Sequence, residues 1–363
     1  MDWSPQQDDA LQRVSAWLKA RTPQVFRLFG FAGTGKTTLA RHFAEGLEGE
    51  VVFGAFTGKA AHVLRAKGCE GAATIHSLIY RPKATDVEEP SFVINRDGGA
   101  AKADLIVIDE CSMVDEELGR DLLSFGAPVL VLGDPAQLPP VKGGGFFTEA
   151  EPDVMLTEVH RQARDNPIIR LSMQVREGEG LSLGDYGESR VIRRSGIDAG
   201  AVLQTDQVLV GMNRTRRLYN RRIRELKGFR DAMPAASEKL VCLRNDKKKG
   251  LLNGGLWQIR QIREPRGGYL RLDVAPDEDP QRKAVKVKVL REFFEGADEE
   301  IPFLVRRDSD EFTYGYALTV HKAQGSQWDD VVLFDESGAF REHRQRWLYT
   351  GLTRAARRIT VVV

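Results

Sequence analysis

The residues best suited to chemistry lie in a glycine-rich segment, GFAGTGKT at positions 30–37. An apolar run at positions 25–29 precedes it and a helical pattern follows it, so the segment joins a buried strand to a helix N-terminus. Such a turn directs several backbone N–H groups at one point, where the helix dipole adds positive charge. Lys36 can then reach the outer phosphates of a nucleoside triphosphate, and the Thr37 hydroxyl can ligate Mg²⁺. The residues predicted to bind the nucleotide here are Gly30, Gly33, Thr34, Gly35, Lys36, Thr37 and Thr38.

Two acidic residues, Asp109 and Glu110, follow another buried run at positions 105–108. A carboxylate at the end of such a strand, opposite Thr37, can hold Mg²⁺ through water. The adjacent Glu110 can polarise a water in line with the γ-phosphate, which favours hydrolysis over transfer. Acids in this position can also cap the next helix, but the phosphate loop upstream makes the Mg²⁺ interpretation the stronger one.

The strands that must position these residues form one predicted sheet. Further apolar runs at positions 51–56 and 128–132 alternate with helical patterns, which indicates a parallel sheet covered on both faces. Ligands of such sheets lie at the carboxyl ends of the strands. The polar residues that fall just after strand ends, and that we expect to lie close together, are Lys36, Thr57, Asp109, Asp134 and Gln137.

The first predicted helix begins at the sequence Ser4-Pro5-Gln6-Gln7. Ser4 is a suitable N-cap, and Gln7 stands where it would close a capping box. That role for Gln7 is purely structural. The alternative is functional, because an amide with both a donor and an acceptor can recognise adenine.

Composition limits the class of protein. With 363 residues the chain is long enough for two or three domains. Lys and Arg number 53 against 52 Asp and Glu, so a nucleic-acid partner requires locally clustered charge. For each cluster taken alone, a solvated helix face or loop is the favoured interpretation. The clusters are Arg214, Arg216, Arg217, Arg221, Arg222 and Arg224; residues 247–249; and Arg341, Arg344 and Arg346.

The three cysteines, Cys69, Cys111 and Cys242, are widely spaced. They provide neither a disulfide framework nor a C-x-x-C metal site, which suits a reducing compartment. No apolar run approaches the roughly 18 residues of a membrane span, and the first residues lack the pattern of a signal peptide. We therefore expect a cytoplasmic protein without a membrane partner.

Two segments interrupt the alternation of strands and helices. Residues 81–101 are rich in Pro and Gly around the apolar patch Phe92-Val93-Ile94, which indicates either a disordered loop or a small hairpin. Residues 237–310 contain two strictly alternating runs, at 270–274 and 285–289, separated by turn residues. This longer segment predicts a small β-barrel inserted into a second α/β domain.

The chain resembles the superfamily 1 DNA helicases, and specifically the RecD/Dda-like enzymes of subgroup B. The resemblance extends from Gln7 to Ala355. It rests on eight segments in order: GFAGTGKT (30–37), FTGKAA (56–61), TIHSL (74–78), VIDECSMVD (107–115), LGDPAQLPPV (132–141), LTEVHRQ (156–162), GYALTVHKAQGSQWD (315–329) and LYTGLTRA (348–355).

This resemblance implies two RecA-like P-loop domains with parallel sheets, at 1–160 and 161–363. The insertion at about 82–101 would be a small pin-like subdomain, 1B. The insertion at about 237–310 would be an SH3-like β-barrel, 2B. The implied activity is ATP-dependent translocation from 5′ to 3′ on single-stranded DNA, with unwinding of duplex DNA by a monomer that uses Mg²⁺. Two alternatives remain open: a motor that does not unwind, and a nucleic-acid-binding subunit that uses ATP only as a switch.

The resemblance also assigns roles at the nucleotide. Gln7, with Gln6 as a neighbouring possibility, would read adenine. Gln137 would sense the γ-phosphate, and Arg161 and Arg354 would reach it from the second domain. Lys36, Asp109 and Glu110 would have the roles already argued.

Nucleic-acid contacts follow from the remaining segments. Thr, His and Lys side chains can bond phosphate oxygens without reading sequence, as a translocase requires. Related helicases often have Glu where this chain has Gln327, so a ribose contact by that carboxylate is not expected. Phe92 would separate strands at a duplex junction. The residues implied to bind DNA are Thr57, Lys59, His76, Thr319, His321 and Lys322.

Overall fold

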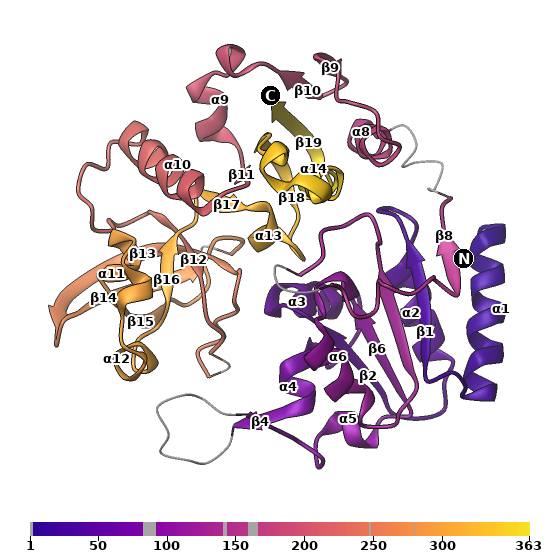
Figure 1. Ribbon diagram of the computed structural model, residues 1–363. Coiled ribbons are helices and arrows are strands. Elements are labelled where there is room, and N and C mark those ends of the chain that lie inside the picture. Colours follow the sequence, from indigo (N-terminus) through magenta and orange to yellow (C-terminus); the bar gives the residue numbers. More distant parts are fainter. Residues whose placement is uncertain (1–2, 83–91, 141–143, 159–165, 247, 280) are drawn as a thin grey trace. The chain divides into compact units, whose positions relative to one another are not determined.

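The computed structural model describes residues 3–82, 92–140, 144–158, 166–246, 248–279 and 281–363. The chain forms two compact units (Figure 1). The first contains Met1–Thr85, Pro90–Leu181 and Glu342–Thr353, and the second consists mainly of Ser182–Arg341 and Arg354–Val363.

The first unit is built on a six-stranded parallel sheet with the order β3-β2-β6-β7-β1-β8. Successive residues of its inner strands belong to two different cores. In β6, Leu105 and Val107 pack in one core, and Ile106 and Ile108 pack in the other. The predicted sheet with two covered faces is therefore confirmed. Its strands are β1 (Val25–Gly30), β2 (Val51–Ala55), β3 (Ala73–Thr74), β6 (Leu105–Asp109), β7 (Val129–Gly133) and β8 (Val154–Leu156).

Helices cover both faces of this sheet. The first helix begins as its sequence predicts, because the Ser4 hydroxyl accepts from the Gln7 N–H and the Gln7 side chain accepts from the Ser4 N–H. The helices of the first unit are α1 (Pro5–Ala20), α2 (Lys36–Glu45), α3 (Gly58–Ala66), α4 (Ile75–Ile79), α5 (Gly99–Lys102), η1 (Cys111–Met113), α6 (Glu116–Leu123), α8 (Pro167–Arg176) and α14 (Arg344–Leu352).

A two-stranded antiparallel hairpin extends from the end of α4. Its strands β4 (Tyr80–Pro82) and β5 (Phe92–Ile94) pair Tyr80 with Ile94 and Pro82 with Phe92. Of the two interpretations of this insertion, the described strands favour the hairpin.

The second unit has its own six-stranded sheet, with the order β17-β11-β18-β19-β10-β9. All its neighbours are parallel except β9, which is antiparallel to β10. The strands are β9 (Gly184–Tyr186), β10 (Ser189–Ile192), β11 (Gln207–Val210), β17 (Ala317–Thr319), β18 (Trp328–Phe334) and β19 (Ala355–Val362). Its helices are η2 (Arg194–Gly196), α9 (Ala199–Gln204), α10 (Asn213–Leu226) and α13 (Val320–Ala323), and η4 (Ser337–His343) leads into α14.

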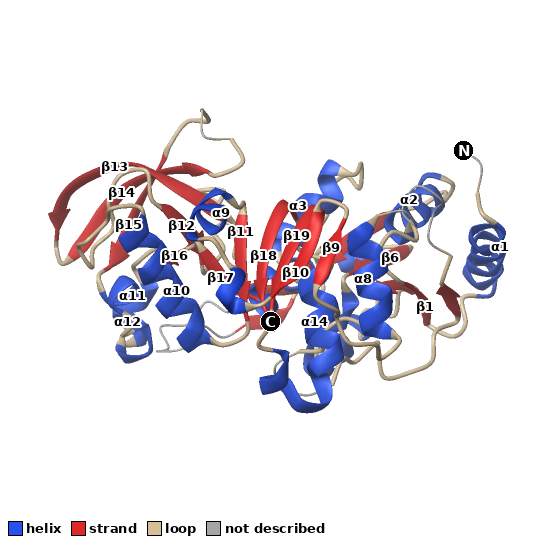
Figure 2. Cartoon of the chain, turned by 90° about the horizontal axis from the view of Figure 1, so that it is seen from above, coloured by secondary structure: helices blue, strands red, loops and turns tan. Residues whose placement is uncertain are grey.

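A five-stranded antiparallel sheet, ordered β15-β14-β13-β12-β16, is inserted between α10 and β17 (Figure 2). Alternate residues of β14, such as Leu270 and Leu272, are buried in its core, as the sequence predicts. The elements are β12 (Lys239–Cys242), β13 (Leu256–Arg266), β14 (Tyr269–Pro276), β15 (Val285–Leu290), α11 (Glu292–Glu295), η3 (Asp298–Glu300), α12 (Phe303–Arg307) and β16 (Phe312–Tyr314).

The limits of the first unit differ from the sequence-based boundary at residue 160. Contacts group α8 and α14 with the first sheet, although α14 stands near the C-terminus. A single boundary along the chain could not assign α14 to the first unit, because residues 182–341 of the second unit separate α14 from the rest of the first unit in the sequence. In the part of the chain that the structure describes, no helix is long and apolar enough to span a membrane.

Candidate functional site

The phosphate loop connects β1 to α2 and depends on glycine at three places. Gly33 and Gly35 have φ values of 79° and 83°, which L-residues with side chains rarely adopt. A Cβ at Gly30 would lie 2.6 Å from the Thr34 hydroxyl and 2.8 Å from the Leu156 Cβ. The glycine spacing is therefore a requirement of the backbone, and it forms the kind of N–H concavity that binds anions.

Three polar side chains meet at this loop. The Lys36 ammonium donates to the carbonyl oxygens of Gly30 (2.6 Å) and Phe31 (3.0 Å), so it lies along the loop. The Thr37 hydroxyl donates to Asp109 Oδ2 at 3.0 Å. This bond joins the two segments predicted to hold Mg²⁺, and hydroxyl and carboxylate oxygens are ligands that this ion prefers.

Glu110 follows in a strained conformation. Its φ and ψ are 53° and 45°, in the left-handed region, and its N–H donates to Asp109 Oδ1 at 2.8 Å. Strained residues of this kind concentrate at functional sites, where the surrounding structure fixes a side-chain direction. The turn therefore gives Asp109 and Glu110 separate directions although they are adjacent.

Gln137 stands on a buried turn beyond β7. The turn is closed by Asp134, whose Oδ1 accepts from the Ala136 N–H at 3.0 Å and whose carbonyl accepts from the Gln137 N–H. Among the described residues, Gln137 Oε1 is buried and has no hydrogen-bond partner. An orphaned buried acceptor is costly, so this oxygen fits a site that a ligand or its attacking water completes. With the glycine cradle and the Thr37–Asp109 pair, these residues fit Mg²⁺ and a nucleoside triphosphate.

Two helices that sequence reasoning did not place here contact the same loop. The Tyr349 hydroxyl of α14 donates to Asp134 Oδ2 at 2.6 Å and accepts from the Ala32 N–H at 3.2 Å. Burial, together with the Asp134 carboxylate, raises the pKa of Tyr349, so the hydroxyl stays a donor. From α8, the Arg176 guanidinium lies 3.6 Å from the centre of the Phe31 ring. Tyr349 lies within the segment LYTGLTRA, so this segment was the sequence signal that could have identified it as a site residue.

The two glutamines at the N-terminus bond to protein groups. Gln7 Nε2 donates to the Thr34 carbonyl at 3.1 Å, which ties the capping box of α1 to the phosphate loop. Gln6 Nε2 donates to the Thr157 hydroxyl at 2.9 Å, and its Oε1 accepts from the Thr157 and Glu158 N–H groups. The structural alternative for Gln7 is thus present, and its predicted adenine contact stays a prediction. Thr38 lies in the first turn of α2.

The predicted arginines are placed differently. Arg354 belongs to the second unit, is 5% exposed, and donates from Nη1 to the Ser326 carbonyl at 3.2 Å. Arg161 lies outside the described residues. The role of both at the γ-phosphate stays a prediction.

The predicted DNA contacts of the first unit begin at the end of β2. Thr57 caps α3, its hydroxyl accepting from the Ala60 N–H at 3.1 Å, and Lys59 follows in the first turn. His76 belongs to an unbroken row of rings. Neighbouring centroids in this row lie 5.6–6.4 Å apart. The row consists of Phe56, His76, Tyr80 and Phe92.

The row ends on the hairpin. Phe92 is 57% exposed, and its ring centroid lies 6.4 Å from that of Tyr80 on the same hairpin. An exposed aromatic at the end of a row of rings is suited to stacking on a base.

In the second unit, Thr319 caps α13 by accepting from the Lys322 N–H at 3.3 Å. The His321 ring lies 5.5 Å from the ring of Phe340. The Lys322 ammonium donates to Asn253 Oδ1 at 2.7 Å, and burial lowers its pKa. Its described contact therefore ties α13 to the inserted sheet, and its predicted DNA contact stays untested.

Residues 3–196 match the family described as AAA domain, and residues 314–362 match the UvrD-like helicase C-terminal domain. The ATP-dependent RecD2 DNA helicase of Deinococcus radiodurans is 31% identical over 90% of this chain and 45% of its own length. The ATP-dependent DNA helicase dda of Enterobacteria phage T4 is 32% identical over 49% of this chain and 43% of its own length. The chain thus spans less than half the length of these two relatives.

Solved structures share the fold. A Pif1 structure described for DNA unwinding at forked duplexes covers 99% of this chain and 92% of its own, with a TM-score of 0.60 at 17% identity. Bacteroides Pif1 bound to single-stranded DNA has a TM-score of 0.58 at 18% identity, covering 99% and 92%. The family matches and the ordered motifs on this α/β fold lead to one conclusion: the chain belongs to the superfamily 1B helicases, with the RecD/Dda-like proteins.

Proposed function

We propose that this chain is an ATP-dependent DNA helicase that moves from 5′ to 3′ on single-stranded DNA and unwinds duplexes. One observation carries the proposal: the Thr37–Asp109 bond, which joins the phosphate loop to the acidic end of β6. The neighbouring strand β7 leads into the turn that carries the orphaned Gln137 oxygen. The printed names of RecD2 and Dda, both ATP-dependent DNA helicases, support the same activity.

In the proposed reaction, ATP is the substrate and each residue has a separate task. Lys36 binds the outer phosphates, and Thr37 and Asp109 hold Mg²⁺, which would neutralise charge developing on the phosphates. Glu110 accepts a proton from the attacking water, and Gln137 orients that water. Arg161 and Arg354 stabilise the transition state, so hydrolysis requires the two RecA-like domains to close.

The nucleic-acid path uses two kinds of contact. Thr57, Lys59, Thr319 and His321 bond backbone phosphates, which carry no sequence information. The aromatic row that includes His76 offers ring faces to bases, a contact that tolerates any sequence. Lys322 is assigned to the same nucleic-acid path because it stands on α13, next to His321.

Two further elements complete the proposal. The five-stranded insertion is an SH3-like subdomain that helps to enclose the strand, and the β4–β5 hairpin acts as the pin at the fork. Phe92 stacks on the terminal base pair, and stacking of this kind contributes roughly 1–3 kcal/mol per base. The protein acts as a monomer in this scheme.

The test is unwinding of duplexes that carry either a 5′ or a 3′ single-stranded tail, with ATP hydrolysis followed in parallel. We expect unwinding of the 5′-tailed duplex only, with hydrolysis stimulated by DNA. Hydrolysis without strand displacement on either duplex would identify a translocase. Nucleotide binding without turnover would identify a switch.

A further inference from the structure

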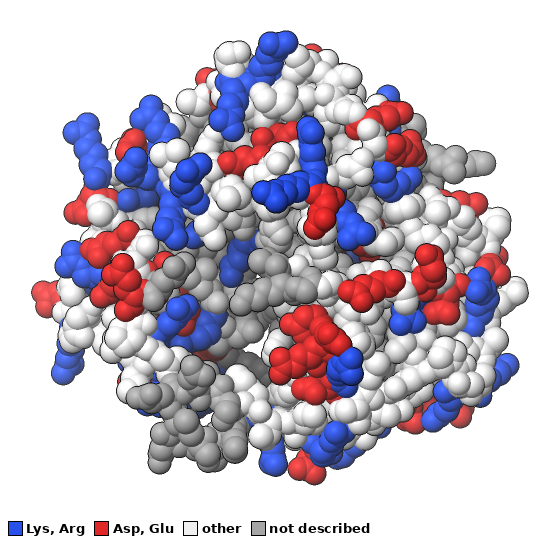
Figure 3. All heavy atoms as spheres, viewed as in Figure 1, with Lys and Arg blue, Asp and Glu red and all other residues white. Residues whose placement is uncertain are grey.

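Helix α10 of the second unit carries six arginines, and Figure 3 shows Lys and Arg side chains gathered over it. Three of these arginines are paired within the chain. Arg221 and Arg222 both contact Glu225, and Arg224 is buried against Glu238 with N–O distances of 2.7 and 2.9 Å. Arg224 thus has a carboxylate of its own, and Arg221 and Arg222 share one.

Arg216 and Arg217 differ from these neighbours. Among the described residues, neither side chain has an ion pair or a hydrogen bond, and Arg216 Nε is buried without any partner. Burial lowers the pKa of Arg216, and the adjacent Arg217 charge lowers it further, while the Asp298 carboxylate acts in the opposite direction. Two adjacent guanidinium groups, one of them partly desolvated, are costly unless an anion joins them.

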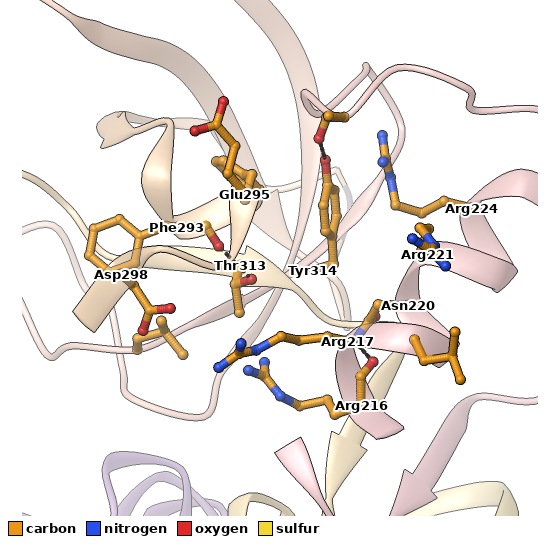
Figure 4. Close-up of a pocket in the computed structure, with 15 residues that line it drawn as sticks. Arg216, Arg217, Asn220, Arg221, Arg224, Phe293, Glu295, Asp298, Thr313 and Tyr314 are labelled. Atoms are coloured by element: carbon orange, nitrogen blue, oxygen red, sulfur yellow. Dashed lines mark hydrogen bonds between the residues drawn. The ribbon is translucent and has the colours of Figure 1, made fainter. Parts of the chain in front are cut away.

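Both arginines face a cavity of about 420 Å³ between α10 and the inserted sheet. Figure 4 shows Arg216 and Arg217 extending side by side toward Asp298, whereas Arg221 and Arg224 lie apart from them. The wall opposite α10 comes from Phe293, Phe294, Glu295, Gly296 and Thr313. Glu295 is itself within 3.9 Å of Arg291, so Asp298 is the carboxylate that opposes the pair.

We propose that Arg216 and Arg217 together bind one backbone phosphate of single-stranded nucleic acid. Planar guanidinium forks match phosphate oxygens, and two of them supply more donors than one phosphate needs. The inference rests on the proposed function, because nucleic acid is the phosphate source that the rest of the site predicts.

The position of the pair favours this source. Arg216 lies close enough to Lys322 to lower the pKa of that ammonium, and Lys322 stands on α13 beside Thr319 and His321. Helix α10 also packs against β17, the strand that leads into α13, so the cavity and the predicted phosphate contacts of α13 lie in the same unit. A strand bound along α13 would reach the arginine pair by extending over the inserted sheet.

The test measures the affinity of the full chain for a fluorescent oligothymidylate over a series of salt concentrations. Each phosphate contact to single-stranded DNA contributes about 0.7 to the slope of log affinity against log salt. We expect Arg217→Ala to weaken binding roughly tenfold at low salt and to reduce the slope by less than about 0.7, because Arg216 still contacts the shared phosphate. Arg217→Lys restores the slope, because it keeps the charge. Arg222→Ala, on the same helix but outside the cavity, leaves affinity and slope unchanged.

A double variant tests whether one phosphate is shared. If Arg216 and Arg217 bind the same phosphate, each single variant reduces the slope by less than about 0.7, and the double variant reduces it by about 0.7 in total, the value for the loss of one phosphate. Thermal unfolding of each variant shows whether the fold is kept.

The inference and the proposed function fail in different ways. If the wild type does not bind the oligonucleotide, the proposed function is wrong. If the wild type binds and folded Arg217→Ala binds with the same affinity and slope, only the inference is overturned. Binding of inorganic phosphate that requires Arg217, while Arg217→Ala keeps the wild-type affinity and slope for the oligonucleotide, would show a small-anion site and would also overturn the inference.

Discussion

Each unit contains a strand that leads directly into a helix. The two turns between strand and helix differ in whether a carboxylate of the chain itself occupies the backbone N–H groups. In the first, the β1–α2 turn is rich in glycine, and Lys36 and Thr37 start the helix. In the second, the β11–α10 turn is filled by the chain's own carboxylate: Glu336 Oε2 accepts from the N–H groups of Gly211 (2.6 Å) and Met212 (3.1 Å). Glu336 Oε1 also accepts from the Thr215 hydroxyl at 2.6 Å.

This difference separates the tasks of two similar folds. The start of a helix attracts negative charge wherever it occurs. In the second unit, the Glu336 carboxylate supplies this negative charge from within the chain. It packs so closely that a Cβ at Gly211 would lie 2.9 Å from the Glu336 Cβ. In the first unit, a bound anionic ligand would supply the negative charge. We infer that only the first turn binds a nucleotide and that the second is structural.

The largest effect is expected from breaking the first turn. Lys36→Ala removes the ammonium that binds the outer phosphates, so turnover should fall by more than about three orders of magnitude. Binding of single-stranded DNA should stay within a few-fold, because other residues make those contacts. Substantial DNA-stimulated hydrolysis in this variant would show that the phosphate-loop assignment is wrong.

Arg354→Ala removes a predicted contribution of the second unit to the first turn. Turnover should fall by about three orders of magnitude while ATP affinity changes little, because such an arginine serves the transition state. Equilibrium binding of a nucleotide analogue and single-turnover hydrolysis separate the two quantities. Since Arg354 is buried, the thermal unfolding of the variant is compared with that of the wild type to show that the fold is kept. Equal losses of affinity and turnover would assign a ground-state role.

A smaller effect is expected at Tyr349, which joins the phosphate loop to the turn that carries Gln137. Tyr349→Phe leaves Asp134 without its 2.6 Å bond and should lower kcat about tenfold, with KM for ATP nearly unchanged. Tyr186→Phe is the matched control, because its hydroxyl bonds the Ser182 carbonyl in an exposed loop of the second unit. A wild-type kcat in Tyr349→Phe would limit the hydroxyl to a structural role.

Breaking the second turn should affect stability and leave catalysis intact. Glu336→Gln replaces a carboxylate that accepts three hydrogen bonds, so the free energy of unfolding should fall by about 1–3 kcal/mol. KM for ATP should not change. Glu342→Gln, at an exposed position of the 3₁₀ segment that follows Glu336, should alter stability by less than about 0.5 kcal/mol. Denaturant unfolding distinguishes the two, and an altered KM in Glu336→Gln would contradict the assignment of this turn.

Local features of the first unit could be predicted from the sequence. The phosphate loop, the acids after β6 and the capping box of Ser4 and Gln7 depend on residues close together in the chain or on strand ends at one edge of a sheet. Their residue types and spacings therefore predict their positions.

The residues that the sequence could not place are joined by long-range packing. Tyr349 is 215 residues from Asp134, and Glu336 is 125 residues from Gly211. The i,i+4 spacing of Arg221 and Glu225 predicts their pair, but the cavity that Arg216 and Arg217 face depends on the inserted sheet. The orphaned oxygen of Gln137 is likewise a property of its buried surroundings.

The most direct test of the central claim is the number of nucleotides that one chain binds. Equilibrium titration of the full chain with a non-hydrolysable ATP analogue and Mg²⁺ should give one site per chain, lost in Lys36→Ala and kept in Glu336→Gln. Two sites per chain, or binding that survives Lys36→Ala and disappears in Glu336→Gln, would contradict the division of roles between the two turns.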